Sequence, residues 1–161
     1  MSERNLSNQL LAQRISEQLE WLQQQTSPIY RALPVQFLTC NVSEQWVEFS
    51  HQTTPLGQNP HGMLHGGVTA WLLDTANGIV CRGFSGFSAA PSLDLHINYL
   101  KAIPMDQKLI LRTTLKRLGT RIINLYDEIR NPETNTLYVT ATANSYLPPN
   151  IPLLEQSDFH L

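Results

Sequence analysis

The sequence is poor in cysteine and has neither an excess of basic charge nor a long apolar run. Its 161 residues include 11 Lys and Arg against 13 Asp and Glu, which gives a formal net charge of −2. A chain with this balance carries no positive field to attract nucleic acid, so we expect no nucleic-acid partner. No run of about 18 apolar residues occurs, and we therefore expect no membrane-spanning helix.

Only two cysteines are present, Cys40 and Cys81. This number excludes a disulfide-rich scaffold, and the two show no spacing typical of a metal site. Residues 1–5 lack the apolar run of a signal peptide. We therefore expect a cytoplasmic protein in which both thiols are free.

The composition favours a single domain over 1–161 with one hydrophobic core. Hydrophobic residues make up 42% of the chain, with 3 Trp, 5 Tyr and 5 Phe, which is enough to bury a core. The pattern predicts, in chain order, an amphipathic helix over 5–25, strands near 35–41 and 45–51, a helix over 66–82, and strands over 91–99, 107–117, 121–130 and 136–147. The short connections between the last strands suit antiparallel neighbours.

The helix expected over 66–82 is apolar almost all round. Its apolar residues are Val68, Ala70, Trp71, Leu72, Leu73, Ala76, Ile79 and Val80. A helix of this kind is buried on most of its sides. The sheet must therefore curl around it, or a second copy of the chain must cover it. Gly83 and Gly86 are expected to break the chain after this helix.

Two glycines begin the same helix. Gly66 and Gly67 allow a tight entry and the close approach of a ligand to the backbone. The first N–H groups of a helix have no partner within it, and the helix dipole adds a partial positive charge there. An oxyanion formed beside the Gly66 N–H during acyl transfer would be stabilised. Glycine is also common at helix starts, so the pattern alone leaves a purely structural role open.

Asp74 lies in the middle of this apolar helix. A buried carboxylate is costly unless it is hydrogen-bonded, and such a group is a candidate base or nucleophile. The alternative is that Asp74 bonds Thr75, Asn77 or the backbone and organises the core. From Gly66 to Asp74 the helix rises about 12 Å, so one carbonyl cannot contact both groups of one chain. If both are catalytic, each site takes Asp74 from one subunit and Gly66 from the other, in an obligatory dimer.

The loop before the helix carries two further candidates, Asn59 and His65. Either can bind a carbonyl or carboxylate, or hold the loop in shape. His61 and His65 are four residues apart, but Gly62 disfavours a helix there and no third ligand lies at helical spacing. We therefore expect no metal site.

The strand expected over 91–99 alternates strictly, with Ser92, Asp94, His96 and Asn98 on one face. Asp94 and His96 are interpreted as solvated or interface residues of that face. No serine nucleophile elbow and no glycine-rich phosphate loop is present.

The motif Asn-x-x-Gly-x-x-His-Gly-Gly at residues 59–67, followed by Asp74, resembles the hotdog-fold acyl-CoA thioesterases. The similarity is greatest to the phenylacetate-pathway thioesterases and the human thioesterase-superfamily proteins, and it covers residues 30–147. It implies an α+β hotdog fold, in which a curved antiparallel sheet of five or six strands wraps a long central helix. The N-terminal helix over 5–25 and a C-terminal tail over 148–161 would then be additions to the hotdog core.

The resemblance also implies roles for the site residues. The Gly66 N–H would polarise the thioester carbonyl, and Asp74 of the partner chain would activate water or attack directly. Asn59 and His65 would orient the thioester, and Ser92 would help to hold the water. The subunits would form a homodimer, often a dimer of dimers.

Coenzyme A would be part of the substrate, and no separate cofactor is implied. Its pantetheine arm would lie in a channel between subunits, with Gly67 among the residues that bind the substrate. The acyl group would enter an apolar pocket, for which Met63, Trp71, Phe84 and Phe87 are the candidates.

The leading interpretation is therefore hydrolysis of acyl-CoA thioesters to free acid and CoA. One alternative is a non-catalytic hotdog protein that binds acyl groups or CoA. Another is a hotdog lyase acting on enoyl or 3-hydroxyacyl thioesters, although such enzymes typically pair a histidine with a carboxylate in a differently spaced motif. The sequence leaves open the natural acyl group, the choice between CoA and acyl-carrier protein, and the choice between dimer and tetramer.

Overall fold

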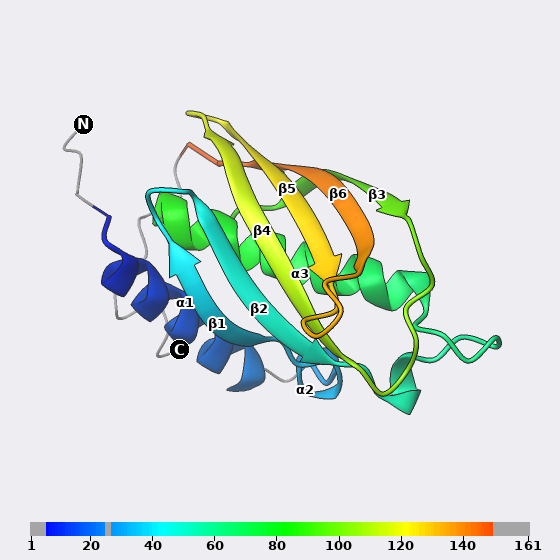
Figure 1. Ribbon diagram of the computed structural model, residues 1–161. Helices are drawn as coiled ribbons and strands as arrows, with labels where there is room; N and C mark the ends of the chain where they lie inside the picture. The colour runs from blue at the N-terminus through cyan, green and yellow to red at the C-terminus, as the bar shows by residue number, and fades with distance from the viewer. Residues whose placement is uncertain (1–5, 25–26, 150–161) are drawn as a thin grey trace.

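Six antiparallel strands form one sheet that curves around a long helix, as the computed structural model shows (Figure 1). The structure describes residues 6–24 and 27–149. The strands lie in the order β1-β2-β4-β5-β6-β3. Their bounds are β1 Gln36–Asn41, β2 Trp46–Gln52, β3 Ser92–Tyr99, β4 Lys108–Leu118, β5 Ile122–Arg130 and β6 Leu137–Tyr146. The predicted antiparallel sheet is confirmed. The tail from residue 150 onward and the predicted helix ends at residues 5 and 25 lie outside the described residues.

The central helix α3 spans Gly66–Ser85 and continues past its predicted end at residue 82. Gly83 does not break it, because this glycine lies inside the helix at the contact with α1. A Cβ there would lie 3.0 Å from Leu11 Cδ1, so the glycine allows the two helices to approach closely. Gly86 ends the helix with a φ of 73°, in the left-handed region that glycine adopts without steric penalty.

One long face of α3 packs against the sheet, and another face is left uncovered. The fully buried side chains include Leu72, Leu73, Ala76, Ile79 and Val80. On the uncovered face, Asp74 is exposed, while Trp71, Gly78 and Arg82 are half-buried. The sheet and α1 therefore cover much of α3, while the face that carries Asp74 stays open within one chain.

Two helices precede the sheet. The amphipathic helix α1, Asn8–Gln24, buries Leu11, Ile15, Leu19 and Leu22 and lies against α3 and β1 (Figure 1). A single turn, α2 Ile29–Ala32, was not predicted, because one turn is too short to show a helical period. No helix among the described residues is long and apolar enough to cross a membrane.

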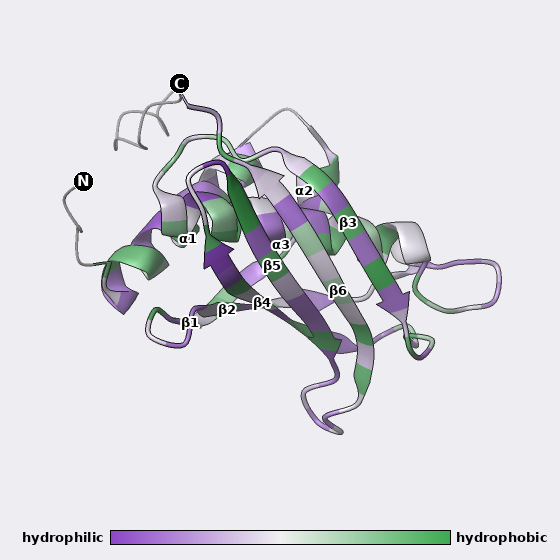
Figure 2. Cartoon of the chain, turned by 90° about the horizontal axis from the view of Figure 1, so that it is seen from above, coloured by the Kyte–Doolittle hydropathy of each residue, from purple (hydrophilic) through white to green (hydrophobic). Residues whose placement is uncertain are grey.

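Strand β3 departs from the strict alternation that the sequence predicted. Ser92 pairs with Ser145, but Asp94 pairs with the adjacent residue Asn144. Leu93 is therefore the extra residue of a β-bulge. Ser92 consequently faces α3, whereas Asp94 accepts hydrogen bonds from Asn144 on the outer face. The expectation that Ser92 shares a face with Asp94 is wrong. β3 forms one edge of the sheet, as Figure 2 shows.

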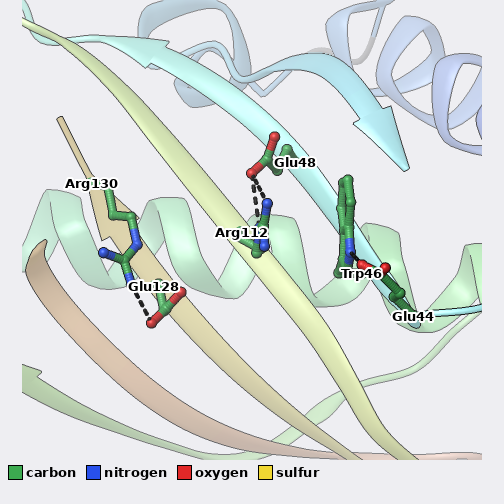
Figure 3. A network of polar contacts seen from close by, with 6 residues as sticks. All are labelled: Glu44, Trp46, Glu48, Arg112, Glu128 and Arg130. Carbon is green, nitrogen blue, oxygen red and sulfur yellow. Dashed lines mark hydrogen bonds and ion pairs between the residues drawn. The ribbon is translucent and has the colours of Figure 1, made fainter. Parts of the chain in front are cut away.

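The outer face of the sheet, turned away from α3, carries charged side chains that pair across strands (Figure 3). Arg112 of β4 contacts Glu48 of β2 at 2.7 Å, and Arg130 contacts Glu128 within β5 at 2.8 Å. The Arg112 guanidinium also lies 4.4 Å from the ring centroid of Trp46. Each of these two arginines therefore has a carboxylate partner on the outer face.

Asp127 is the only carboxylate that is fully buried among the residues the structure describes. Its side chain is 0% exposed and accepts hydrogen bonds from Thr113 Oγ1 at 2.7 Å and Asn77 Nδ2 at 3.1 Å. Burial raises the pKa of Asp127 to about 7, although these two hydrogen bonds oppose the shift. A polar link thus joins β4, β5 and α3 within the core.

Candidate active site

Asp74 lies on the uncovered face of α3 and is held by Ser92. Ser92 Oγ donates a hydrogen bond of 2.6 Å to Asp74 Oδ1, a length typical of a bond to a charged acceptor. Both residues are exposed, so the expected burial of Asp74 within one chain is wrong. The second oxygen, Oδ2, receives no hydrogen bond from the described residues and is free to accept a proton or attack an electrophile.

The start of α3 is capped by His65. Its Nδ1 accepts a hydrogen bond from Gly67 N–H at 2.8 Å, and its carbonyl oxygen accepts from the N–H groups of Val68 and Thr69. Of the first four N–H groups of the helix, only that of Gly66 has no acceptor among the residues the structure describes. This donor, at the positive end of the helix dipole, suits a carbonyl oxygen or an oxyanion. Gly67 N–H is already engaged and is not available to a substrate in this conformation.

Asn59 and His65 each use one polar group to shape the entry loop. Asn59 Oδ1 accepts from the backbone N–H groups of His61 and Met63, at 2.9 and 3.1 Å. Because His65 Nδ1 accepts a hydrogen bond, its neutral ring carries the proton on Nε2. Asn59 Nδ2 and His65 Nε2 make no hydrogen bond within the described part of the chain. Each residue therefore combines a structural role with a donor that a thioester can reach.

Strand β3 supports α3 at two points. Besides the contact from Ser92 to Asp74, Tyr99 Oη donates to the Gly66 carbonyl oxygen at 2.9 Å. The first and last residues of one strand therefore hold the carboxylate and the helix start. Tyr99 was not predicted as a site residue, because an exposed tyrosine at a strand end can equally be hydrogen-bonded to water.

A cavity of about 420 Å³ opens beside Asp74 and Ser92, within the usual size range of small-molecule sites. Its lining residues come from α1, α2, α3, the start of β3 with the segment before it, and the segment after β6. They are Leu22, Tyr30, Trp71, Asp74, Thr75, Gly78, Arg82, Ala89, Ala90, Pro91, Ser92 and Pro148. The walls are mostly apolar. The polar groups are concentrated on α3, as expected for a site that holds an apolar group and reacts at one end.

Of the four residues expected to form the acyl pocket, only Trp71 lines this cavity, where its ring centroid lies 5.6 Å from that of Tyr30. Phe84 is buried in the core, because it lies on the covered face of α3. Phe87 packs against the core, and Met63 lies in the entry loop, where it bridges to Pro104.

The described residues contain no group of three or more His, Cys, Asp and Glu side chains placed to hold a metal ion. Cys40 and Cys81 are both free. Burial raises the pKa of the Cys81 thiol to about 11, so this residue is a poor nucleophile at neutral pH.

Known proteins with related sequences are thioesterases. A family model described as the thioesterase superfamily matches residues 61–138. The acyl-coenzyme A thioesterase THEM4 of Bos taurus is 32% identical over 91 residues, which cover 56% of this chain and only 36% of that relative. The medium/long-chain acyl-CoA thioesterase YigI of Escherichia coli (strain K12) is 25% identical over 134 residues, 74% of this chain and 84% of the relative.

The fold is also found in solved structures. Thioesterase superfamily member 2 of zebra fish superposes with a TM-score of 0.74 at 17% identity, over 89% of this chain and 100% of that one. The chain therefore has the hotdog fold of this solved structure, and it is similar in sequence to the thioesterase superfamily over residues 61–138.

Proposed function

We propose that this protein hydrolyses acyl-CoA thioesters to free acid and CoA. The proposal rests on two groups of α3, the Asp74 carboxylate and the Gly66 N–H. The Asp74 carboxylate is oriented by Ser92 at the cavity of about 420 Å³, and the Gly66 N–H is free of acceptors in the described chain. The two relatives named as acyl-CoA thioesterases support the choice of substrate.

In the proposed reaction, the thioester carbonyl oxygen accepts a hydrogen bond from Gly66 N–H, with Asn59 Nδ2 and His65 Nε2 as further donors. Asp74 Oδ2 removes a proton from water as the water oxygen attacks the carbonyl carbon, or it attacks that carbon itself. The negative charge that develops on the carbonyl oxygen is stabilised by the helix N-terminus. The carbon–sulfur bond then breaks, and the CoA thiolate takes up the proton that Asp74 removed from water. On the direct-attack route the thiolate takes a proton from solvent, and water then hydrolyses the anhydride between the acyl group and Asp74, which releases the acid and restores the carboxylate.

The two halves of this site belong to different subunits. Both groups lie on one unbroken helix, eight residues apart, which corresponds to about 12 Å. A reacting carbonyl must approach both groups to about 3 Å. Asp74 must therefore act with Gly66 of the partner subunit.

The edge strand β3 offers a geometry for this sharing. Two copies of β3 that pair antiparallel about a two-fold axis at the centre of Ser92–Tyr99 place Ser92 of one chain opposite Tyr99 of the partner subunit. Ser92 contacts Asp74, and Tyr99 contacts Gly66. This pairing consequently brings each Asp74 toward the partner's Gly66.

The apolar surface at this edge supports the same arrangement. Leu93 and Tyr99 are each 56% exposed, and Leu100 is 51% exposed. A long edge strand with exposed apolar side chains is a surface that proteins normally cover. A second copy of β3 covers it and completes two equivalent sites. A dimer of dimers is compatible with the same pairing.

The direct test measures free-thiol release from a panel of acyl-CoA esters by the purified protein. Asp74→Asn and Asp74→Ala are expected to lower kcat/KM by about 10²- to 10⁴-fold, the range for loss of a general base. Glu133→Gln, which removes one negative charge in the exposed β5–β6 turn, is the matched control and is expected to retain activity.

Light scattering must show that the Asp74 variants remain dimeric. Unchanged turnover in both would overturn the role of Asp74. Thermal stabilisation by acyl-CoA esters without turnover of any of them would favour the non-catalytic binder, and hydration of an enoyl-CoA would favour the lyase.

The proposed chemistry uses side chains, a backbone N–H and water, and it requires no cofactor beyond the CoA of the substrate. We also propose a cytoplasmic location, which suits two free cysteines, because thiols stay reduced in that compartment.

A further inference from the structure

Arg82 lies in the same cavity as Asp74, two helical turns further along α3. Residues 74, 78 and 82 are spaced by four, so they follow one another along the same side of the helix. Arg82 Nε donates to the Gly78 carbonyl oxygen at 3.1 Å. No carboxylate in residues 6–24 and 27–149 forms an ion pair with the Arg82 guanidinium, and its two terminal nitrogens make no hydrogen bond there.

Two arginines of the sheet, by contrast, are paired with carboxylates. Arg112 and Arg130 on the outer face are each paired with a glutamate (Figure 3). Arg82 is half-buried, and burial lowers the pKa of Arg82, with the nearby Tyr30 opposing the shift. Since arginine is seldom buried unless it is paired, the Arg82 terminal nitrogens are suited to an anionic group that enters the cavity.

The position of the guanidinium relative to the reacting end sets the size of such a ligand. Gly78 lies one turn beyond Asp74, a rise of about 6 Å. Arg82 Nη2 would lie 4.0 Å from a Cβ built on Gly78, so the guanidinium folds back over this glycine toward Asp74. The wall of the same cavity also includes the apolar side chains of Trp71 and Ala90.

We propose that Arg82 binds a carboxylate at the far end of the acyl group, so that the preferred substrates are short to medium ω-carboxyacyl thioesters. The inference rests on the proposed hydrolysis at Asp74. The planar guanidinium matches a carboxylate with two parallel hydrogen bonds. The apolar wall contacts the methylene groups, and the thioester carbon then lies at Asp74.

The test compares kcat/KM for glutaryl-, adipyl- and suberyl-CoA with pentanoyl-, hexanoyl- and octanoyl-CoA, chain length by chain length. The wild-type protein is expected to prefer the ω-carboxyacyl ester of a matched pair. Arg82→Met should reduce this preference by about 10- to 100-fold, the range for a hydrogen bond to a charged group. Arg82→Lys should retain part of it. Arg117→Met, which removes an exposed arginine of the β4–β5 hairpin, should leave the preference unchanged.

The N-acetylcysteamine esters of the same acids, which lack the CoA phosphates, identify the anion that Arg82 recognises. An unchanged effect of Arg82→Met on these esters supports the proposal. An effect confined to the CoA esters assigns Arg82 to the phosphates and overturns it. The proposal is also overturned if Arg82→Met lowers kcat/KM equally for both esters of each pair, or if the wild-type protein prefers the esters of the unsubstituted acids. If Asp74-dependent hydrolysis persists in those cases, the proposed function stands without this inference. If no ester is hydrolysed, both fail.

Discussion

Ser92 Oγ lies 2.6 Å from Asp74 Oδ1, and this contact joins the bulged end of the edge strand β3 to the middle of α3. The bond occupies one carboxylate oxygen and leaves the other for chemistry. It also fixes the carboxylate on a helix face that the sheet does not cover. The orientation of Asp74 therefore depends on the local geometry of β3.

Removal of the Ser92 hydroxyl is expected to lower kcat more than it raises KM. Ser92→Ala should reduce kcat roughly tenfold, since the bond links a hydroxyl to a charged acceptor at an exposed position. Ser92→Thr keeps a hydroxyl at the same position and serves as the control. Steady-state kinetics on one good acyl-CoA ester measure both variants. Equal kcat in the alanine and threonine variants would show that Ser92 does not orient Asp74.

The role of the Gly66 N–H can be isolated with two substitutions. Gly66→Pro deletes the N–H at the first helical position, where proline is well tolerated. The preceding His65 has φ −67° and ψ 134°, a conformation that suits a residue before proline. Gly66→Ala keeps the N–H but adds a Cβ, which would lie 3.3 Å from Tyr99 Oη.

We expect kcat for Gly66→Pro to fall about 10²- to 10³-fold below that of Gly66→Ala, as for the loss of one oxyanion donor. Circular dichroism checks that α3 is retained in both. If the proline and alanine variants turn over at the same rate, the N–H does not contribute to catalysis.

Two glycines of α3 should respond in opposite directions to alanine. At Gly78 the added Cβ would meet only Arg82 Nη2, at 4.0 Å, so Gly78→Ala should raise the free energy of unfolding by about 0.5–1 kcal/mol through helix propensity. At Gly83 the Cβ would lie 3.0 Å from Leu11 Cδ1, and overpacking should lower the free energy of unfolding. Urea denaturation measures both variants. Destabilisation by Gly78→Ala would contradict the open space described at this position.

The buried Asp127 predicts a specific pH dependence of stability. Its folded pKa is raised to about 7, above the value of about 3.9 for an unfolded aspartate. The folded protein therefore binds more protons between these values, and the stabilisation is complete below about pH 3.9 and lost as the pH rises to about 7.

Asp127→Asn should remove this pH-dependent contribution to the free energy of unfolding. The difference in unfolding free energy, wild type minus variant, is expected to fall steadily as the pH is raised from 4 toward 8. Denaturation curves collected at intervals across that range give the difference directly. A difference that is constant with pH, or that increases, would show that Asp127 does not titrate as described.

The main helices and strands could be predicted because their periodic patterns of apolar residues extend over many residues. The alternating strands and the apolar helix led to the antiparallel sheet around α3, and the glycine entry at Gly66 coincides with the start of that helix. Period alone does not say which side of an all-apolar helix remains open. Asp74 was therefore expected to be buried, whereas the buried carboxylate is Asp127, on a strand whose alternation resembles that of its neighbours.

Contacts that depend on local distortions or on tertiary packing were also missed. The bulge that turns Ser92 toward α3 interrupts an alternation of polar and apolar residues that is regular in the sequence, so the alternation did not predict it. The Tyr99 hydroxyl reaches Gly66 only because β3 lies against α3. The spacing of eight residues from Asp74 to Arg82 is visible in the sequence. Only the folded structure shows that no carboxylate among the described residues pairs with Arg82.

Mixed dimers test the proposal that each active site combines Asp74 of one subunit with the partner's Gly66. Asp74→Asn and Gly66→Pro chains are co-expressed with different affinity tags, and the heterodimer is isolated by two successive affinity steps. If the site is shared, one of the two sites of the heterodimer contains both an intact Gly66 N–H and an intact Asp74. The heterodimer is then expected to regain about half of the wild-type kcat, although each homodimeric variant is nearly inactive. A heterodimer as inactive as its parents would show that the two groups do not act together across the dimer.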